Sequence, residues 1–493
     1  MSAPPSPSGE AARQAPSALL ILFILLLLAI RLSLAAVIPL TEDEAYYRIW
    51  SQAPALGYFD HPPMIAWWIW LGRHLAGDTA LGVRLLPSVG CALTSLLVFD
   101  LARTLGASRR SAERATVWYN AMLLVVAGGF LAVPDAAAAF FWMLALCACA
   151  RAWDRRSSGW WVATALAAGL ASLSKYSSLF LAPGVFMWLI ASRSGRERLR
   201  SPGPWLALAI GAAVFAPNVA WNATHHWLTF SKQFGRIAPH RFAPRYVLEF
   251  LGAQILLLNP LVAAFIPRAL SEEVLRRRIA MPAMTSAPFL VYLLIHSLHD
   301  RVQAHWPAPL YAPAAIVAAA GAEGLGGWIW RTLRLSAPIF GFGACAAGLL
   351  YLTAPAFGVP LRFDPAWPIR RWGPFVDRIE ATRRAEGARW IGTTSYGLAA
   401  QLLDRTGIGA PVTQISERDR WDGLPVPVAD FSSPGLIVDL SRRVNPTLLR
   451  HCFSTVTPLG EVSRAAPGEK GRPYALVLVS GPRRDIERDG CGF

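Results

Sequence analysis

A series of long apolar segments limits how this chain can fold more than any other feature. A helix needs about 20 mostly apolar residues to cross a bilayer, and roughly eleven such segments follow one another from residue 18 onward. At 54% hydrophobic and 16% charged residues, the chain is too apolar for an ordinary soluble domain. The sequence therefore predicts an all-α polytopic membrane protein with about 11 transmembrane helices. The expected spans are 18–38, 81–101, 116–133, 136–152, 160–173, 178–191, 205–221, 247–266, 283–298, 307–322 and 336–354.

The net charge of +16 comes from arginines that gather in alternate loops. Cytoplasmic loops of membrane proteins collect Lys and Arg, so these loops are predicted to be cytoplasmic together with the N-terminus. The loop after the first span and the whole tail then lie on the opposite side. No basic groove with interleaved aromatics supports nucleic-acid binding. The clustered residues are Arg103, Arg109, Arg110, Arg114, Arg151, Arg155, Arg156, Arg193, Arg196, Arg198, Arg200, Arg268, Arg276, Arg277, Arg278, Arg331 and Arg334.

The first apolar run is interpreted as a retained span. It is long, Arg31 interrupts it, and no good small-residue cleavage site follows it, so a cleaved signal peptide fits less well. Cysteine positions agree with this topology. Four cysteines fall in spans, whereas Cys452 and Cys491 lie in the exported tail, where an oxidising compartment allows a disulfide between them.

The chain changes character near residue 355, where charge, Gly and Pro become more frequent. We therefore predict two domains, a membrane domain of residues 1–354 and a soluble α/β domain of residues 355–493. In the tail, residues 390–395, 435–440 and 474–479 are predicted strands, and 398–405 is a predicted helix. The tail shows no nucleophile–base spacing, so a substrate-side or packing role is expected. No internal repeat of the kind found in inverted-repeat transporters is evident.

The first outside loop, residues 40–80, carries the densest acidic motif. Glu42, Asp43 and Glu44 follow Thr41 directly after the first span. Carboxylates near hydrocarbon are costly to desolvate, so they need water, a partner or a function. A structural alternative exists, because Thr41 and Glu44 have the spacing of a capping box. The Trp-rich stretch 62–76 is short and interrupted by charge, so it is predicted to be an interfacial helix.

Further polar residues stand at the outside ends of other spans. Each has an ordinary explanation: Asp135 can cap a helix, Lys175 can extend to the interface, and His305 can be a loop histidine. Together, however, cations and carboxylates from several loops on one face are what a reaction on a lipid-linked anionic substrate requires. These residues are Asp135, Lys175, Tyr176, Arg301 and His305.

At these positions the sequence resembles the bacterial branch of the dolichyl-phosphate-mannose protein mannosyltransferase superfamily, which includes the aminoarabinose transferases that modify lipid A. The resemblance covers roughly the first 320 residues and is much weaker in the tail. It rests on five motifs: Thr-Glu-Asp-Glu-Ala-Tyr-Tyr at 41–47, Tyr-Phe-Asp-His-Pro-Pro-Met at 58–64, Val-Pro-Asp at 133–135, Ser-Lys-Tyr-Ser-Ser at 174–178 and Gln-Ala-His-Trp-Pro at 303–307.

The resemblance implies a GT-C fold with a periplasmic C-terminal domain in the bacterial inner membrane. It also implies an inverting transfer of one sugar from a polyprenyl phosphate donor to lipid A, lipopolysaccharide or another envelope acceptor. Asp43 of the Asp43–Glu44 pair becomes the catalytic carboxylate, and Asp60 and Asp135 position sugar or acceptor. Candidates for the donor phosphate and sugar are His61, Lys175, Tyr176, Arg301 and His305. His61 replaces a lysine of the aminoarabinose transferases, so the contact made there is left open.

Several alternatives remain open at this stage. A secondary transporter or lipid flippase, or a non-catalytic scaffold that binds partners through its tail, also accounts for many spans. The sequence does not name the sugar or the acceptor. No cofactor is indicated, and a divalent metal ion is left undecided because GT-C enzymes differ in this requirement.

Overall fold

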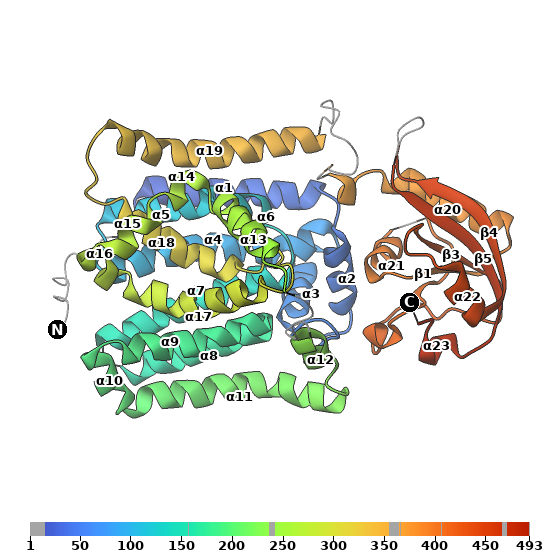
Figure 1. The fold of residues 1–493 in the computed structure, drawn as a ribbon, viewed down its shortest axis with the longest axis horizontal. Helices are drawn as coiled ribbons and strands as arrows, with labels where there is room; N and C mark the ends of the chain where they lie inside the picture. Colours follow the sequence, from blue (N-terminus) through green and yellow to red (C-terminus); the bar gives the residue numbers. More distant parts are fainter. Residues whose placement is uncertain are drawn as a thin grey trace. The chain divides into compact units, whose positions relative to one another are not determined.

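The computed structural model describes residues 15–155, 157–235, 242–353, 364, 366–405, 407–465 and 471–492 (Figure 1). The chain divides into two compact units. Unit 1 comprises Met1–Ala36 and Leu56–Leu349, and unit 2 comprises Val37–Ala55 and Leu350–Phe493. The predicted division at residues 354 and 355 grouped the whole loop 40–80 with the membrane helices. In the structure, Val37–Ala55 instead packs with the tail, because helix α2 (Glu42–Trp50) buries its aromatic face there.

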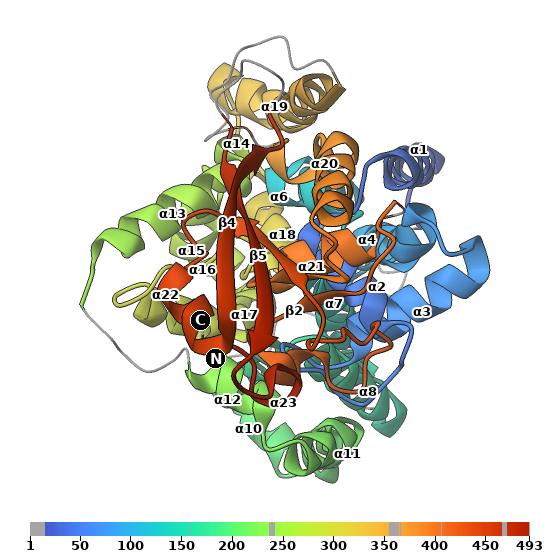
Figure 2. The same ribbon diagram turned by 90° about the vertical axis from the view of Figure 1, so that its right-hand side faces the viewer.

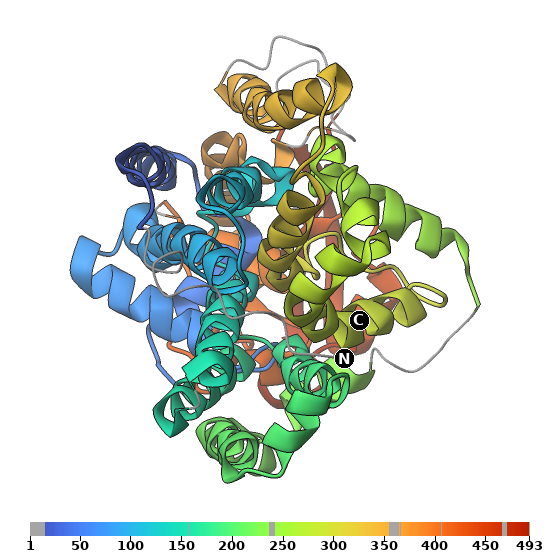
Figure 3. The ribbon, with the colours of Figure 1, turned by 90° about the vertical axis from the view of Figure 1, so that its left-hand side faces the viewer.

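Unit 1 consists of helices, which Figure 3 shows nearly end-on. Five helices are long and apolar enough to cross a membrane, or six if one bent pair counts as a span, among the described residues. Shorter apolar helices occupy other expected spans, so a helix lies at each of the eleven predicted segments. The helices are α1 (Ala18–Val37), α3 (Met64–Ala76), α4 (Ala80–Thr104), α5 (Arg109–Ala121), α6 (Leu123–Gly128), α7 (Pro134–Arg155), α8 (Ser158–Ser174), α9 (Leu181–Ile190), α10 (Arg193–Leu199), α11 (Pro202–Thr224), α12 (Leu228–Gly235), α13 (Arg245–Leu257), α14 (Pro260–Ala263), α15 (Ile266–Ser271), α16 (Glu273–Arg278), α17 (Ala280–His296), α18 (Tyr311–Gly321) and α19 (Trp328–Thr353).

Two predicted spans are not continuous helices. The segment 116–133 breaks at Met122, between α5 and α6. The segment 247–266 bends by 97° between α13 and the following helices. At that bend Asn259 has φ +69°, and its side-chain nitrogen donates to the carbonyls of Ala121 (3.1 Å) and Ala337 (2.7 Å). Pro260 cannot donate a helical hydrogen bond, which ends the preceding helix, and Asn259 ties the break to α5 and α19.

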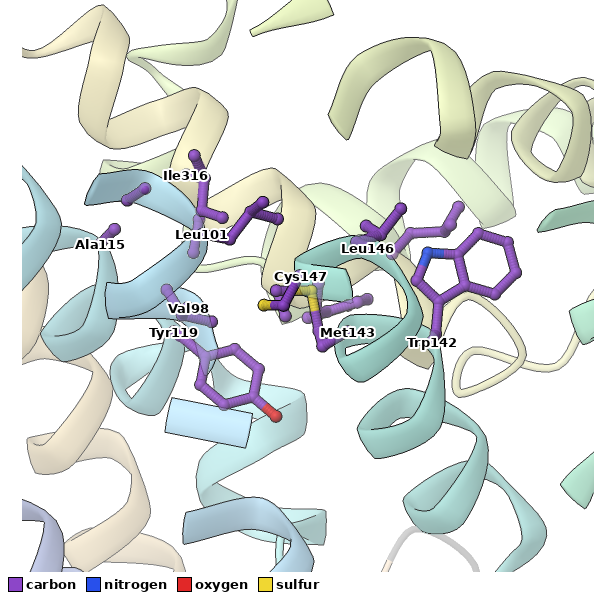
Figure 4. Packing of buried hydrophobic residues seen from close by; sticks show 14 of the residues in the cluster. Val98, Leu101, Ala115, Tyr119, Trp142, Met143, Leu146, Cys147 and Ile316 are labelled. Carbon is purple, nitrogen blue, oxygen red and sulfur yellow. The ribbon is translucent and has the colours of Figure 1, made fainter. Parts of the chain in front are cut away.

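The core of unit 1 lies among α4, α5, α7 and α18. Val98, Trp142 and Leu146 are fully buried there, and Figure 4 shows them packed with neighbouring side chains from these helices. Small residues allow other helices to approach closely. A Cβ added at Gly184 of α9 would lie 2.4 Å from the carbonyl oxygen of Thr285 on α17. Close backbone approach of this kind is how membrane helices gain van der Waals contact.

Basic residues gather at one end of unit 1. The last turns of α10 and α16 carry arginines, and these two helices lie at the same end, whereas α12 lies at the other (Figure 1). Both arginine-rich helices coincide with loops that the sequence predicts to be cytoplasmic. The arrangement therefore agrees with the predicted charge asymmetry.

Unit 2 contains a five-stranded sheet in the order β2-β1-β3-β5-β4, in which β1 is parallel to β2 and β3, and β5 is antiparallel to β3 and β4 (Figure 2). Side chains of α20 and α21 join one apolar cluster with the sheet, and those of α22 and α23 join another. The bounds are β1 (Trp390–Thr393), β2 (Val412–Gln414), β3 (Gly435–Leu440), β4 (Phe453–Ser463), β5 (Pro473–Pro482), α20 (Trp372–Ala385), α21 (Tyr396–Leu403), α22 (Pro446–Cys452) and α23 (Ile486–Asp489).

The tail elements predicted from sequence coincide with β1, β3, β5 and α21. The strand β4 was not predicted, because most of its residues are exposed and its apolar pattern is weak. A disulfide joins Cys452 and Cys491, whose Cα atoms lie 6.0 Å apart, and so ties α22 to the end of the chain.

We expect Gly184→Ala to destabilise unit 1, because the added methyl group meets the Thr285 backbone, and overpacking of this kind costs about 1–3 kcal/mol. Thermal unfolding of the detergent-purified protein, followed by tryptophan fluorescence, should show a lower Tm. Gly252→Ala is the matched control, since no heavy atom lies within 4 Å of the added Cβ. A Tm that falls equally in both variants would contradict the packing argument.

Candidate functional site

The acidic motif forms the start of α2, and its capping box is present. The Thr41 hydroxyl accepts from the Glu44 backbone N–H (3.4 Å), and a Glu44 carboxylate oxygen accepts from the Thr41 backbone N–H (3.0 Å). Glu44 is completely buried. The reciprocal hydrogen bonds satisfy backbone donors that a helix start leaves open. Glu44 thus serves the cap, as its spacing from Thr41 predicted.

Asp43 meets a side chain from the tail. The Tyr396 hydroxyl, at the start of α21, donates to Asp43 Oδ1 at 2.8 Å. The neighbouring acid, Glu42, also reaches α21, since a Cβ added at Gly397 would lie 2.6 Å from Glu42 Oε2. Desolvation raises the pKa of Glu42, while Arg464 opposes this rise. The sequence did not link either acid to the tail.

Three further contacts hold α2 against α21. The Gln401 side chain donates to the Leu40 carbonyl at 2.9 Å, just before the helix begins. At the other end, Arg48 forms an ion pair with Asp404. Between them, the Tyr46 ring lies 5.0 Å from Tyr396, centroid to centroid. The aromatic contact and the two polar contacts fix both ends of the acidic helix.

In unit 1, two predicted site residues from separate loops form a buried pair. Lys175 Nζ lies 2.7 Å from Asp135 Oδ1, and the two side chains are only 12% and 7% exposed. His305 Nε2 stands 3.9 Å from the other Asp135 oxygen. Removing one partner of a buried ion pair leaves an uncompensated charge, so Asp135 and Lys175 depend on each other. The structure thus unites three residues that are distant in sequence.

The loop that carries Asp60 and His61 is anchored by side chains of α11 and α12. Its alternate carbonyls, at Leu56, Tyr58 and Asp60, accept hydrogen bonds from the Asn218 (2.8 Å), Thr229 (2.6 Å) and Gln233 (2.5 Å) side chains, respectively. The loop also turns on itself, since the Tyr58 N–H donates to the His61 carbonyl at 3.2 Å. Asp60 and His61 remain partly exposed.

Tyr176 belongs to this anchor. Its hydroxyl donates to Asn218 Oδ1 at 2.9 Å and accepts from the Asn222 side chain at 3.2 Å. Tyr176 therefore supports the Asp60–His61 loop through Asn218.

Arg301 has a different neighbourhood, because it forms an ion pair with Glu249 at 2.7 Å and is 64% exposed. Within the described ranges, no three His, Cys, Asp or Glu side chains come together as a metal site.

An apolar groove with a cavity volume of about 260 Å³ runs between α8, α9 and α11. Its walls are mainly Ala, Leu, Val, Trp and Phe, and Thr164, Ser172 and Ser178 add hydroxyl groups. Ser172 and Ser178 flank Lys175 in the sequence, so one part of the groove lies near the Asp135–Lys175 pair. Such a surface accommodates a hydrocarbon chain.

Several positions of the candidate site were missed by sequence reasoning. Asn218 and Asn222 stand four residues apart in an apolar span, which places them on one helix face, and polar residues at such places are often functional. This spacing was a usable signal. Tyr396 and Gln401 had no such signal, because nothing in the sequence joins the tail to α2.

Comparison with known proteins gives consistent results. The family model described as dolichyl-phosphate-mannose-protein mannosyltransferase matches residues 60–221. Lipid A galacturonosyltransferase RgtD of Rhizobium johnstonii is 29% identical over 355 residues, which are 70% of this chain and 71% of that protein. The crystal structure of ArnT from Cupriavidus metallidurans bound to undecaprenyl phosphate shares the fold, with a TM-score of 0.63, 15% identity, and coverage of 94% of this chain and 99% of ArnT. The chain is a glycosyltransferase with the fold of ArnT.

A further relative of the transferase is the undecaprenyl phosphate-alpha-4-amino-4-deoxy-L-arabinose arabinosyl transferase of Edwardsiella ictaluri, 28% identical over 324 residues. The aligned part is 60% of this chain but only 56% of that relative. The stretch matched by the family model includes Asp60, His61, Asp135 and Lys175, and it does not reach α2.

We expect Asn218→Ala in the transferase to loosen the Asp60–His61 loop, because it removes the hydrogen bonds to both Leu56 and Tyr176. Loss of hydrogen bonds worth about 1 kcal/mol should speed amide exchange in residues 56–63 roughly fivefold, measured by mass spectrometry. Tyr176→Phe should give a smaller increase in exchange, since it removes only the Tyr176–Asn218 bond and leaves the Asn218–Leu56 bond in place. Equal exchange in Asn218→Ala and the wild type would contradict the anchor.

Proposed function

We propose that the transferase moves one sugar, with inversion, from a polyprenyl phosphate donor to lipid A, lipopolysaccharide or another envelope acceptor. Its relatives include a lipid A galacturonosyltransferase and an undecaprenyl phosphate aminoarabinose transferase, which supports this substrate class. The Asp135–Lys175 pair carries the proposal within the structure. A buried cation that lies three residues along the chain from Ser172 and from Ser178, which line the apolar groove, suits the phosphate of a lipid donor.

Asp43 is the proposed general base. The acceptor hydroxyl gives its proton to the Asp43 carboxylate while its oxygen bonds to the anomeric carbon of the sugar. The bond from that carbon to the phosphate oxygen breaks on the opposite face, and polyprenyl phosphate leaves with the bonding electron pair. Attack opposite the leaving group inverts the anomeric centre. Because the Glu44 carboxylate accepts from the Thr41 backbone, Asp43 rather than Glu44 takes this role.

Lys175 is the proposed contact to the departing phosphate, whose negative charge grows as the glycosidic bond breaks. Asp135 holds the Lys175 ammonium in place at 2.7 Å. His305, when protonated, adds a second positive charge near Asp135, and Asp60 and His61 take the sugar or acceptor hydroxyls. Arg301, which is exposed and forms an ion pair with Glu249, is a further proposed contact to the donor phosphate or sugar.

The groove between α8, α9 and α11 is the proposed place of the polyprenyl chain. Its apolar walls replace the lipid environment, while Ser172 and Ser178 lie close in sequence to the phosphate contact. In this topology the N-terminus is cytoplasmic, about 11 segments span the inner membrane, and the tail of residues 355–493 is periplasmic. The position of α10 and α16 at one end of unit 1 supports this orientation.

The first test compares envelope lipids and lipopolysaccharide by mass spectrometry from cells carrying wild-type protein, Asp43→Asn or no protein. We expect one sugar-sized mass difference that only the wild type produces, because the neutral amide cannot take up the acceptor proton. Asp430→Asn is a matched control, since Asp430 is an exposed acid of unit 2. Identical lipid profiles from all cells, with the proteins inserted and folded, would reject a lipid acceptor and direct attention to transport.

Replacing Lys175 by Met should raise the KM for the lipid donor by about 10- to 100-fold, since a hydrogen bond to a charged group contributes about 1.5–3 kcal/mol. The measurement is initial transfer rate against undecaprenyl phosphate-linked sugar at saturating acceptor. Lys175→Arg keeps the charge and should retain most of the affinity. A donor KM in Lys175→Met equal to that of the wild type would remove Lys175 from the phosphate site.

A further inference from the structure

The tail domain presents a set of polar groups at the carboxyl ends of its parallel strands. The chain leaves β1 and turns into α21, and the Thr394 backbone N–H and hydroxyl in this turn donate to Asp439 Oδ2 at 2.9 and 2.8 Å. Asp439 is fully buried near the end of β3, which lies beside β1. The Ser395 side chain then caps α21 at Leu398 N. This turn is therefore rigid, and it fixes the direction in which Tyr396 leaves the sheet.

The chain connections that follow the neighbouring strands β1 and β3 run to opposite sides of the sheet. From β1 the chain passes through α21 to β2 on one side, whereas from β3 it passes through α22 toward β4 on the other side. Side chains of α21 and α22 belong to different apolar clusters. Open α/β sheets bind ligands where neighbouring strands diverge in this way, at their carboxyl ends. In this protein, residues of the acidic helix α2 contact the first turn of α21 at that edge.

Tyr396 lies in an aromatic and cationic setting that strengthens its hydroxyl as a donor. The Arg420 guanidinium carbon lies 4.4 Å from the centre of the Tyr396 ring. A cation over the ring draws electron density from the phenol, so the O–H group that donates to Asp43 becomes more polar. Arg420 itself is held by Glu417 at 2.8 Å. A chain of contacts thus runs from Glu417 through Arg420 and Tyr396 to Asp43.

We propose that Tyr396 of the tail is a positioning residue for the Asp43 carboxylate, with Arg420 acting through the Tyr396 ring. This inference rests on the proposed role of Asp43 as the base. The hydroxyl occupies one lone pair of Oδ1, which holds the carboxylate in one rotamer and favours its charged form. The C-terminal domain then contributes directly to catalysis by orienting the reacting group.

Other charged groups also act on this region of α2. Arg464 and Arg443 lower the pKa of the neighbouring Glu42, while Asp43 and Asp439 raise it. Asp43 lies in α2 itself, Asp439 in β3, Arg443 in the turn after β3, and Arg464 directly after β4, so several elements contribute to the local field. None of them is altered by a Tyr396→Phe substitution, which removes one hydroxyl and keeps the ring that packs on Tyr46.

The test uses the full-length enzyme in lipid nanodiscs, with undecaprenyl phosphate-linked galacturonic acid and 4-amino-4-deoxy-L-arabinose as donors and purified lipid A as acceptor. Tyr396→Phe should lower kcat about 10- to 100-fold with little change in either KM, since it removes one hydrogen bond to a charged group. The acidic limb of the pH–rate profile should also move up by about one pH unit, because one unit corresponds to 1.36 kcal/mol. Tyr46→Phe is the matched control, since it removes a neighbouring hydroxyl that donates to the Arg420 carbonyl at 3.4 Å and keeps the ring that packs on Tyr396.

A second measurement does not depend on turnover. Carbon-13 NMR of protein labelled at aspartate carboxyl carbons follows the Asp43 signal, assigned by its loss in Asp43→Asn. Its titration midpoint should lie at higher pH in Tyr396→Phe than in the wild type or Tyr46→Phe. Identical midpoints in all three proteins would overturn the positioning role. The wild-type protein could also be inactive with these donors while the Asp43 midpoint is still higher in Tyr396→Phe than in the wild type. That result would reject the proposed donors and would leave Tyr396 established as the partner of Asp43.

Discussion

The candidate site depends first on the packing of α2 against α21. The acidic helix has only nine residues, and isolated helices of this length are marginal in water. It is held at both ends, by Gln401 at the Leu40 carbonyl and by Asp404 at Arg48, and its centre buries Tyr46 against Tyr396. These contacts determine where Asp43 points. The tail therefore serves as the support of the acidic helix, which gives the domain a structural purpose that its own sequence does not reveal.

In the membrane unit, burial of charge imposes a second constraint. Asp135 and Lys175 lie in a poorly hydrated environment. Their 2.7 Å contact compensates the cost of removing each charge from water. The same environment makes a positive group effective toward a phosphate, because electrostatic interactions strengthen as water is excluded. The Asp60–His61 loop also contains polar groups that need partners, namely its backbone carbonyls. Its carbonyls obtain hydrogen bonds from Asn218, Thr229 and Gln233, so an irregular loop is held in place without secondary structure.

Local features, such as helices and helix caps, were the ones that the sequence predicted best. The apolar runs predicted helices at all eleven segments, and the Thr41–Glu44 spacing predicted the capping box that is present. Sequence reasoning did not foresee the break at Met122 or the bend at Asn259. Pro260 was a local signal for the second break, but the Asn259 bonds to Ala121 and Ala337, which hold the bend, are contacts with other helices that a local pattern does not contain. The exposed strand β4 was missed because its partner β5, and not its own pattern, holds it in the sheet.

The sequence by itself determined that the chain is a membrane protein, that its acids and cations stand at the ends of spans, and that its motifs resemble a family of lipid-dependent glycosyltransferases. These properties follow from hydrophobic periodicity and from short motifs, which act over a few turns of chain. Only the tertiary structure decided that Asp135 pairs with Lys175 and that Asp43 meets Tyr396, residues 353 positions apart. Such pairings depend on which surfaces are buried together when the chain folds, and burial is a property of the packed chain that no local segment carries.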